Sequence, residues 1–219
     1  MKTKQTGFTL VEIAIVLVII GLLLGGILKG QEMITQAKIK NVVNDFNGIT
    51  AAVNSYQDRY RALPGDDLNA SGRWAGSFNG NGNGQIGATT DTYNAAAITP
   101  VSGMSETLLF WWHLRLAGFV SGTTAAASIS SVQQPANAAS GIMGVQNTGM
   151  GFTSNIICSS NLPDKIAIAV DTQMDDATST TGQVRGLLQT APSPPTGASN
   201  PSVAYAETGT NQYLLCKNM

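Results

Sequence analysis

Charged side chains are scarce in this sequence. They make up 11% of the 219 residues, and 12 basic and 13 acidic side chains leave a net charge of −1. A nucleic-acid-binding surface needs a concentration of lysine and arginine that this composition does not supply. Nucleic acid is therefore not an expected partner.

Histidine is almost absent, which removes the most common catalytic base. His113 is the only histidine, and no serine, cysteine or aspartate motif accompanies it, so we predict a packed or surface residue rather than a catalytic one. The sequence also lacks the G-x-S-x-G and H-E-x-x-H motifs of hydrolases and metalloproteases. These absences predict a protein that is not an enzyme.

Cysteine is also rare, and its spacing does not suggest a metal site. Cys158 and Cys216 lie far apart, with no CxxC or Cys/His arrangement around either. The simplest use of both is one disulfide that closes a loop of about 60 residues, which implies an oxidising compartment. The alternative is two unrelated buried thiols in a cytoplasmic body.

A long apolar run is present near the start of the chain. Residues 8–28 are almost all Leu, Ile, Val, Ala or Gly, and these 21 positions span about 32 Å as a helix, enough to cross one bilayer. The run is too long for a secretory signal peptide, and no small-residue cleavage site follows it. Glu12 lies inside the run, where an unpaired carboxylate costs about 2.5–3.5 kcal/mol, so a simple anchor does not explain it.

The stretch Gly7-Phe8-Thr9-Leu10-Val11-Glu12 follows a short basic leader and resembles the processing motif of type IV pilins and type II secretion pseudopilins. The glycine precedes the cleavage site, the phenylalanine follows it, and the acid is the fifth residue of the mature chain. The resemblance implies that a prepilin peptidase cleaves between Gly7 and Phe8 on the cytoplasmic side and methylates the new amino terminus. Residues 1–7 would then be a cleaved cytoplasmic leader and residues 8–28 a single transmembrane span.

The same resemblance implies a structural subunit, a pilin, of a type IV pilus or pilus-like filament. The precursor would reside in the bacterial inner membrane and the product in an extracellular filament. Its partners would be identical or homologous pilin subunits, the prepilin peptidase/methylase and an inner-membrane assembly platform. During assembly Glu12 would pair with the amino group of Phe8 on a neighbour and so fix the offset between adjacent helices.

Two other functions remain open. One is a pseudopilin of a type II secretion system. The other, from a different class, is a membrane-tethered adhesin-like binding protein that uses Trp74, Phe78 and Tyr93 in a long loop, although loop aromatics more often pack beneath the loop.

The helix is expected to continue beyond the apolar run, so that residues 8–63 form one assembly helix that ends at Pro64-Gly65. Its outer half has apolar residues three and four positions apart, which is the spacing of one helical face. They are Ile39, Val42, Phe46, Ile49, Val53, Tyr56, Tyr60 and Leu63. A globular body is expected to cover this face, and local unwinding near Gly25–Gly30 is left open because glycine weakens a helix.

Residues 66–93 are rich in glycine and asparagine and are predicted to form a loop. Within it, Asn79, Asn81 and Asn83 stand at alternate positions, as in the first half of a calcium-binding loop. All three are neutral, and Thr90 stands where such a loop carries glutamate. A series of Asn-Gly turns is therefore the favoured alternative, and no other cofactor is expected.

The extracytoplasmic head, residues 64–219, is predicted to be α+β. Residues 105–119 should form a helix with Ser105 as its N-cap. Strands are predicted at 155–158, 165–171, 183–188 and 212–217, and they would form a small antiparallel sheet that packs on the outer half of the long helix. Residues 123–151 and 191–202 are expected to be extended or poorly ordered surface segments.

Overall fold

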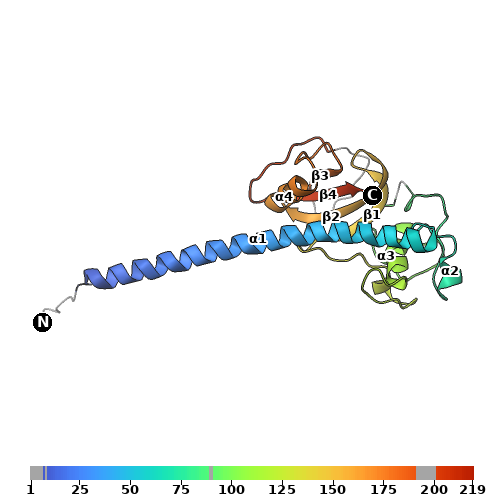
Figure 1. Cartoon of the computed structure of the whole chain (residues 1–219), viewed down its shortest axis with the longest axis horizontal. Helices are drawn as coiled ribbons and strands as arrows, with labels where there is room; N and C mark the ends of the chain where they lie inside the picture. The colour runs from blue at the N-terminus through green and yellow to red at the C-terminus, as the bar shows by residue number, and fades with distance from the viewer. Residues whose placement is uncertain (1–6, 8, 89–90, 191–200) are drawn as a thin grey trace. The chain divides into compact units, whose positions relative to one another are not determined.

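The structure is a computed structural model that describes residues 7, 9–88, 91–190 and 201–219. The chain forms two compact units, Met1–Lys38 and Ile39–Met219. Its elements confirm the predicted α+β class (Figure 1). They are α1 (Leu10–Tyr60), α2 (Ala70–Arg73), α3 (Glu106–Leu116), the 3-10 turn η1 (Ile129–Ser131), β1 (Met143–Gly149), β2 (Phe152–Pro163), α4 (Asp164–Met174), β3 (Val184–Leu188) and β4 (Gln212–Asn218).

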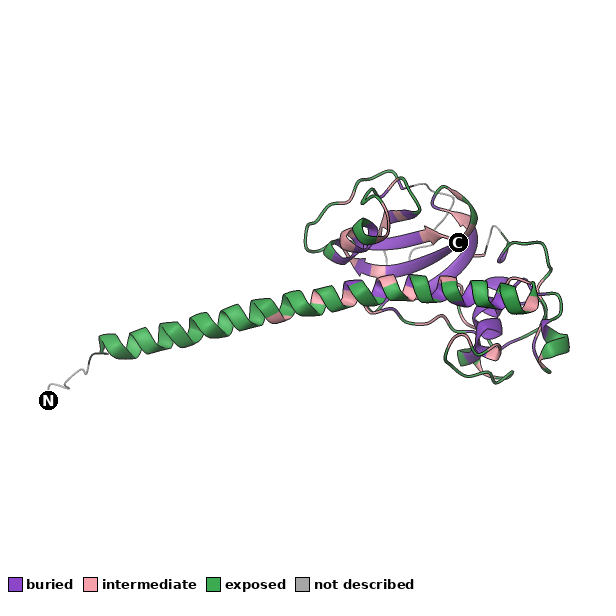
Figure 2. Ribbon diagram, viewed as in Figure 1, coloured by how far each residue is buried: buried purple, intermediate pink, exposed green. Residues whose placement is uncertain are grey.

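Helix α1 is a single α-helix of 51 residues that continues without a break through Gly25, Gly26 and Gly30. It ends at Tyr60, where Arg61 adopts a positive φ of 56° and Pro64 follows soon after. No side chain is buried between Leu10 and Lys38, as Figure 2 shows by its colouring of this segment. The apolar run is therefore not part of a protein core.

In the second unit, the predicted apolar face of α1 lies in the main core. Val42, Phe46 and Tyr56 are fully buried there, and Tyr60 and Leu63 are half-buried at its edge. The other elements contribute further members of this core. They include Trp111, Leu114, Met143, Val145, Ile157, Ile166, Val170 and Leu215. The spacing seen in the sequence thus identified the buried face of α1.

The sheet has four strands in the order β1-β2-β4-β3, and every neighbouring pair is antiparallel. Three of the four predicted strands are confirmed, because residues 155–158 lie in β2, 183–188 overlap β3 and 212–217 lie in β4. The strand β4 comes last in the sequence but lies in the middle of the sheet, between β2 and β3.

The strand predicted at residues 165–171 is wrong, because these residues belong to helix α4. The buried members Ile166, Ala167, Val170 and Asp171 are spaced so that they share one helical face. Asp164 marks the helix start: its carboxylate accepts hydrogen bonds from the amides of Lys165, Thr208 and Gly209 at 2.7 Å each.

The surface segment predicted at residues 123–151 is also wrong in part. It contains η1 and the whole of β1, and Val132, Met143 and Val145 are fully or almost fully buried. A low content of large apolar residues concealed this strand. Gly144 is required there, because a Cβ atom at this position would lie 2.1 Å from the Tyr93 carbonyl oxygen. Of the other predicted surface segment, residues 191–200 lie outside the described residues.

Helix α3 confirms the helix predicted at residues 105–119. The Ser105 hydroxyl accepts a hydrogen bond from the Thr107 amide at 3.3 Å, and Gly118, with a φ of 78°, follows the last turn. All residues from Glu106 to Arg115 are buried. The helix is thus enclosed on every side.

Candidate functional site

The first turn of α1 is closed by reciprocal hydrogen bonds between Thr9 and Glu12. The Thr9 amide and hydroxyl donate to Glu12 Oε2 at 2.9 and 2.8 Å, and the Glu12 amide donates to Thr9 Oγ1 at 3.3 Å. This arrangement is a capping box, in which a threonine before the helix and a glutamate three residues later satisfy each other's backbone amides. The carboxylate is thereby held at the helix N-terminus, where the helix dipole favours negative charge.

The structure describes two of the three residues to which the resemblance assigns roles. Gly7 and Glu12 are exposed, and Phe8 lies outside the described residues. Among the described residues, Glu12 Oε2 accepts the Thr9 bonds, Oε1 accepts no hydrogen bond, and Glu12 has no basic partner. One oxygen of this carboxylate therefore remains available to a group from outside the described chain.

The side chains that follow Glu12 form a continuous apolar surface. Every leucine, isoleucine and valine from Leu10 to Leu28 is between 46% and 91% exposed. α1 is the one helix in the described part of the chain that is long and apolar enough to cross a membrane. Polar side chains return at Lys29, which forms an ion pair with Glu32 at 2.8 Å.

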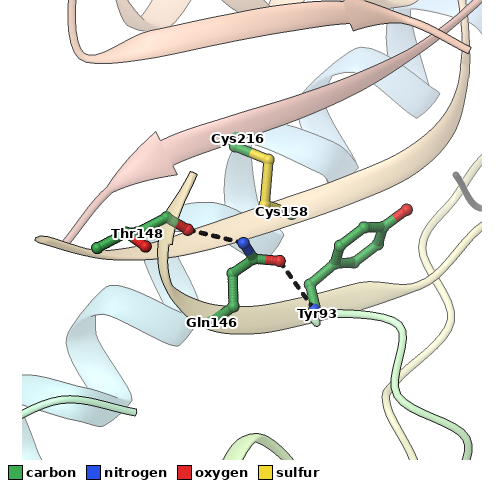
Figure 3. The surroundings of a disulfide bond; sticks show 5 residues. All are labelled: Tyr93, Gln146, Thr148, Cys158 and Cys216. Atoms are coloured by element: carbon green, nitrogen blue, oxygen red, sulfur yellow. Dashed lines mark hydrogen bonds between the residues drawn. A yellow bond between two sulfur atoms is a disulfide. The ribbon is translucent and has the colours of Figure 1, made fainter. Parts of the chain in front are cut away.

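The predicted disulfide is present and connects the two central strands of the sheet. Cys158 of β2 and Cys216 of β4 are bonded, and they face each other in the antiparallel register (Figure 3). Both are fully buried. Beside them, Gln146 of β1 accepts a hydrogen bond from the Tyr93 amide at 3.0 Å and donates one to the Thr148 carbonyl at 2.7 Å. The alternative of two unrelated thiols does not hold.

The loop that was compared with a calcium site is built from asparagine turns. The side-chain oxygen of Asn79 accepts from the Ser71 amide at 2.8 Å, that of Asn81 from the Asn83 amide at 3.0 Å, and that of Asn83 from the Gln85 amide at 2.8 Å. The last two bonds span two residues, as in Asx turns. This arrangement supports the turn alternative, and calcium binding by these residues stays a prediction.

Two buried carboxylates hold this loop in place. Asp66 accepts hydrogen bonds from the amides of Asn83 and Gly84 at 3.0 and 2.7 Å, and Glu106 accepts from those of Asn81 and Gly87 at 2.8 and 2.9 Å. Burial raises the pKa of Glu106, and the two backbone hydrogen bonds oppose that rise. Both carboxylates thus bind backbone amides of the loop.

His113 is a packed residue, as predicted. It is fully buried; Nδ1 accepts a hydrogen bond from the Gly65 amide at 3.0 Å, and Nε2 donates to the Phe78 carbonyl at 2.9 Å. These partners fix the neutral tautomer with its proton on Nε2. Burial lowers the pKa of His113 to about 4; the nearby charge of Arg73 acts in the same direction, and the hydrogen bond to Phe78 opposes it.

The three aromatic residues of the first loop pack against the body of the protein. Tyr93 is fully buried. The half-buried ring of Trp74 lies 5.3 Å from that of Tyr60, and the half-buried ring of Phe78 lies 5.9 Å from that of Trp112. These contacts agree with the expectation that the aromatics pack beneath the loop. Trp74, Phe78 and Tyr93 therefore do not form an exposed aromatic cluster that an adhesin-like function would require.

The functional residue that the sequence analysis missed is Thr9. The signal was present as T-x-x-E at Thr9 to Glu12, directly before an apolar helix, which is the sequence pattern of a capping box. That pattern gives Glu12 a role within its own subunit in addition to the role that the resemblance implies.

Comparison with family models gives a match at the amino terminus. Residues 2–28 match the family model described as the prokaryotic N-terminal methylation motif, which is the signature of type IV pilins and pseudopilins. Searches of curated proteins and of solved structures found no match. The motif supports a pilin-like or pseudopilin-like protein, from a family that is structural rather than enzymatic. Together with α1, it fits a precursor anchored in the inner membrane.

Proposed function

We propose that this protein is a structural subunit of a type IV pilus or pilus-like filament. In this proposal the precursor is cleaved between Gly7 and Phe8, methylated at Phe8, and polymerised through α1. The observation that carries the proposal is the exposed apolar surface of residues 10–28 directly behind a matched processing motif. The disulfide in the head agrees with an extracytoplasmic location, because such bonds persist in oxidising compartments.

The apolar surface needs two successive environments that exclude water. Each Leu, Ile or Val side chain gains about 1.5–3 kcal/mol on burial, so a run of this length is not stable in water. Before assembly the bilayer meets this requirement, since residues 8–28 span about one hydrocarbon core. After assembly the corresponding helices of neighbouring subunits take its place.

Glu12 provides the specific contact in an otherwise uniform surface. Its Oε2 is occupied by Thr9, and its Oε1 is free to accept the methylated amino group of Phe8 from a neighbouring subunit. Cleavage between Gly7 and Phe8 leaves the Phe8–Thr9 peptide bond intact, so the Thr9 amide still donates to Glu12 in the mature subunit. The capping box would therefore present the carboxylate in a fixed position at the moment of assembly.

The test separates the charge of Glu12 from its capping role. Glu12→Gln keeps an acceptor for the Thr9 amide but removes the charge, whereas Glu12→Val removes both. Both variants should insert in the membrane and be processed, and both should lose filaments. Glu32→Gln is the matched control, because it removes an acid of the same helix outside the apolar run, and its filament yield should be unchanged. Normal filament yield from Glu12→Gln would contradict the pairing role.

The alternative within the family is a pseudopilin of a type II secretion system. Mass spectrometry of sheared surface filaments distinguishes the two functions. A pilin should be abundant there, with a methylated Phe8 at its amino terminus and Cys158 bonded to Cys216. Absence from the filaments, together with a secretion defect in the deletion strain, would favour the pseudopilin. Recovery of the native chain with residues 1–7 still attached would contradict both.

A further inference from the structure

A group of three carboxylates lies at the carboxyl end of α4 in the second unit. Asp171, Asp175 and Asp176 each contribute one oxygen atom, and these three atoms lie within 4.8 Å of one another. Asp171 is fully buried, Asp175 is partly buried and Asp176 is exposed. The group therefore reaches from the interior of the protein to its surface.

The innermost carboxylate has an oxygen that the protein does not satisfy. Asp171 Oδ2 accepts a hydrogen bond from the Tyr205 hydroxyl at 2.5 Å, whereas Oδ1 is buried and has no hydrogen-bond partner. Among the buried side-chain atoms of the described residues, it is the one carboxylate oxygen in this state. A buried unpaired oxygen of this kind is costly, and a bound ligand removes that cost.

The negative charge of the group is not balanced by a basic side chain. None of the ion pairs between described residues includes Asp171, Asp175 or Asp176. Burial raises the pKa of Asp171 to about 6, and the charges of Asp176 and Asp175 raise it further; the Tyr205 hydrogen bond opposes this rise, as does the nearby Ala177 amide, which does not reach hydrogen-bonding geometry. No basic group contributes to this shift.

The two outer carboxylates are fixed by the loop that joins α4 to β3. Asp175 Oδ2 accepts hydrogen bonds from the Gln183 and Val184 amides. Asp176 Oδ1 accepts from the Thr178 amide at 2.8 Å, and its Oδ2 accepts from the Thr181 hydroxyl at 2.7 Å. The three acidic side chains are therefore held close together by contacts to other groups, despite their mutual repulsion.

We propose that Asp171, Asp175 and Asp176 bind a divalent cation, and that the cation is calcium. The available ligands are all oxygens, which hard cations prefer. The three oxygens lie within 4.8 Å of one another, so one ion can contact all of them. Calcium takes six to eight oxygen ligands in flexible geometry, whereas magnesium requires a near-ideal octahedron, so an irregular set of carboxylates favours calcium. Three carboxylates with one side open to solvent should bind in the range of extracellular modules, with Kd about 0.1–1 mM.

The experiment measures thermal unfolding of the full chain in detergent micelles at about pH 8, after removal of metal with EDTA. Calcium chloride at about ten times Kd should raise the Tm by about 3–6 °C. Magnesium chloride at the same concentration should give a smaller shift, and sodium chloride at the same ionic strength should not reproduce it.

Four variants locate the site. Asp171→Asn should abolish the calcium shift while its Tm without calcium stays equal or rises, because a buried charge is removed. Asp176→Asn, at an exposed position that does not endanger folding, should weaken calcium binding about tenfold. Asp58→Asn is the matched surface control, and Asn83→Ala tests the asparagine loop; both should keep the full shift.

The proposal is overturned if calcium does not shift the Tm of the unmodified chain. It is also overturned if the shift persists in both Asp171→Asn and Asp176→Asn, or if Asn83→Ala is the variant that loses it. The latter result would place calcium in the asparagine loop. None of these outcomes depends on whether α1 polymerises.

Discussion

The buried histidine should make the head sensitive to mild acid. Protonation of Nδ1 would direct a new N–H at the Gly65 amide, so that two donors would face each other at the present 3.0 Å separation. Arg73, which forms an ion pair with Asp67, adds positive charge nearby, and the Tyr56 ring stacks beside the imidazole at 6.4 Å. The site therefore accepts neutral imidazole and resists its charged form.

The size of the effect follows from the two pKa values of His113, 6.5 in the unfolded chain and about 4 in the folded one. Because the folded pKa is lower, the unfolded state binds the proton first. The contribution of His113 to the free energy of unfolding is fully present above about pH 6.5, and it is lost as the pH falls towards 4. The loss is about 2 kcal/mol between pH 8 and pH 5 and about 3.4 kcal/mol in full.

The assay is urea unfolding of the full chain at pH 8 and pH 5, compared with His113→Gln. The variant loses stability at both pH values, because the glutamine amide does not reproduce the packing of the imidazole beside Tyr56. It has no titratable imidazole, so its pH dependence lacks the His113 contribution. Burial raises the pKa values of Asp45, Glu106 and Asp171, which act in the opposite sense in this range. The informative quantity is therefore the difference between the two proteins.

We expect the unmodified chain to lose about 2 kcal/mol more than His113→Gln between pH 8 and pH 5. Identical pH dependence in the two proteins would refute the assignment of a neutral, acid-resistant histidine. In a thermal assay the same difference corresponds to about 4–8 °C.

Three further predictions concern stability. Replacing Cys158 and Cys216 together by alanine should lower the free energy of unfolding by about 4 kcal/mol, since the bond spans 58 residues; a urea midpoint equal to that of the oxidised unmodified chain, measured without reductant, would contradict this. Phe46→Ala should lower it by about 3–5 kcal/mol, because the ring is fully buried in the core; circular dichroism during unfolding measures this loss, and a change below 1 kcal/mol would contradict the packing. Thr9→Val should weaken the cap of α1 by about 1 kcal/mol, seen as faster amide exchange in the first turn; unchanged exchange would exclude the capping box.

The long helix was predictable because its pattern extends over many turns. From Ile39 to Tyr56 the apolar spacing of three and four residues repeats often enough to exclude the period of a strand. The amino-terminal motif was equally visible, since Gly7, Phe8 and Glu12 lie within six consecutive residues. Local sequence thus carried both the main element and the candidate site.

Helix α4 was missed because a short segment fits two periods at once. In KIAIAVD, Ile166, Ile168 and Val170 alternate as in a strand, yet Ile166, Ala167 and Val170 also fit one face of a helix. The deciding signal was Pro163-Asp164 before the segment, which is a helix start. A run of seven residues is too short for periodicity alone to decide.

The carboxylate group was hidden by that same error. On a helix, Asp171 and Asp175 are four residues apart and project in similar directions, whereas in a strand that ends at residue 171 they have no reason to meet. Tyr205, which binds Asp171, lies 34 residues further along the chain. Its approach depends on tertiary folding, which no local pattern reveals.

The position of β4 has a consequence for the timing of synthesis. Residues 212–218 follow all other strands in the sequence, yet they supply the hydrogen-bonding partner for both β2 and β3. Before residues 212–218 are synthesised, β1 can pair with β2, but β3 has no partner strand. The sheet therefore closes only after these residues emerge, and the disulfide between Cys158 and Cys216 cannot form before then.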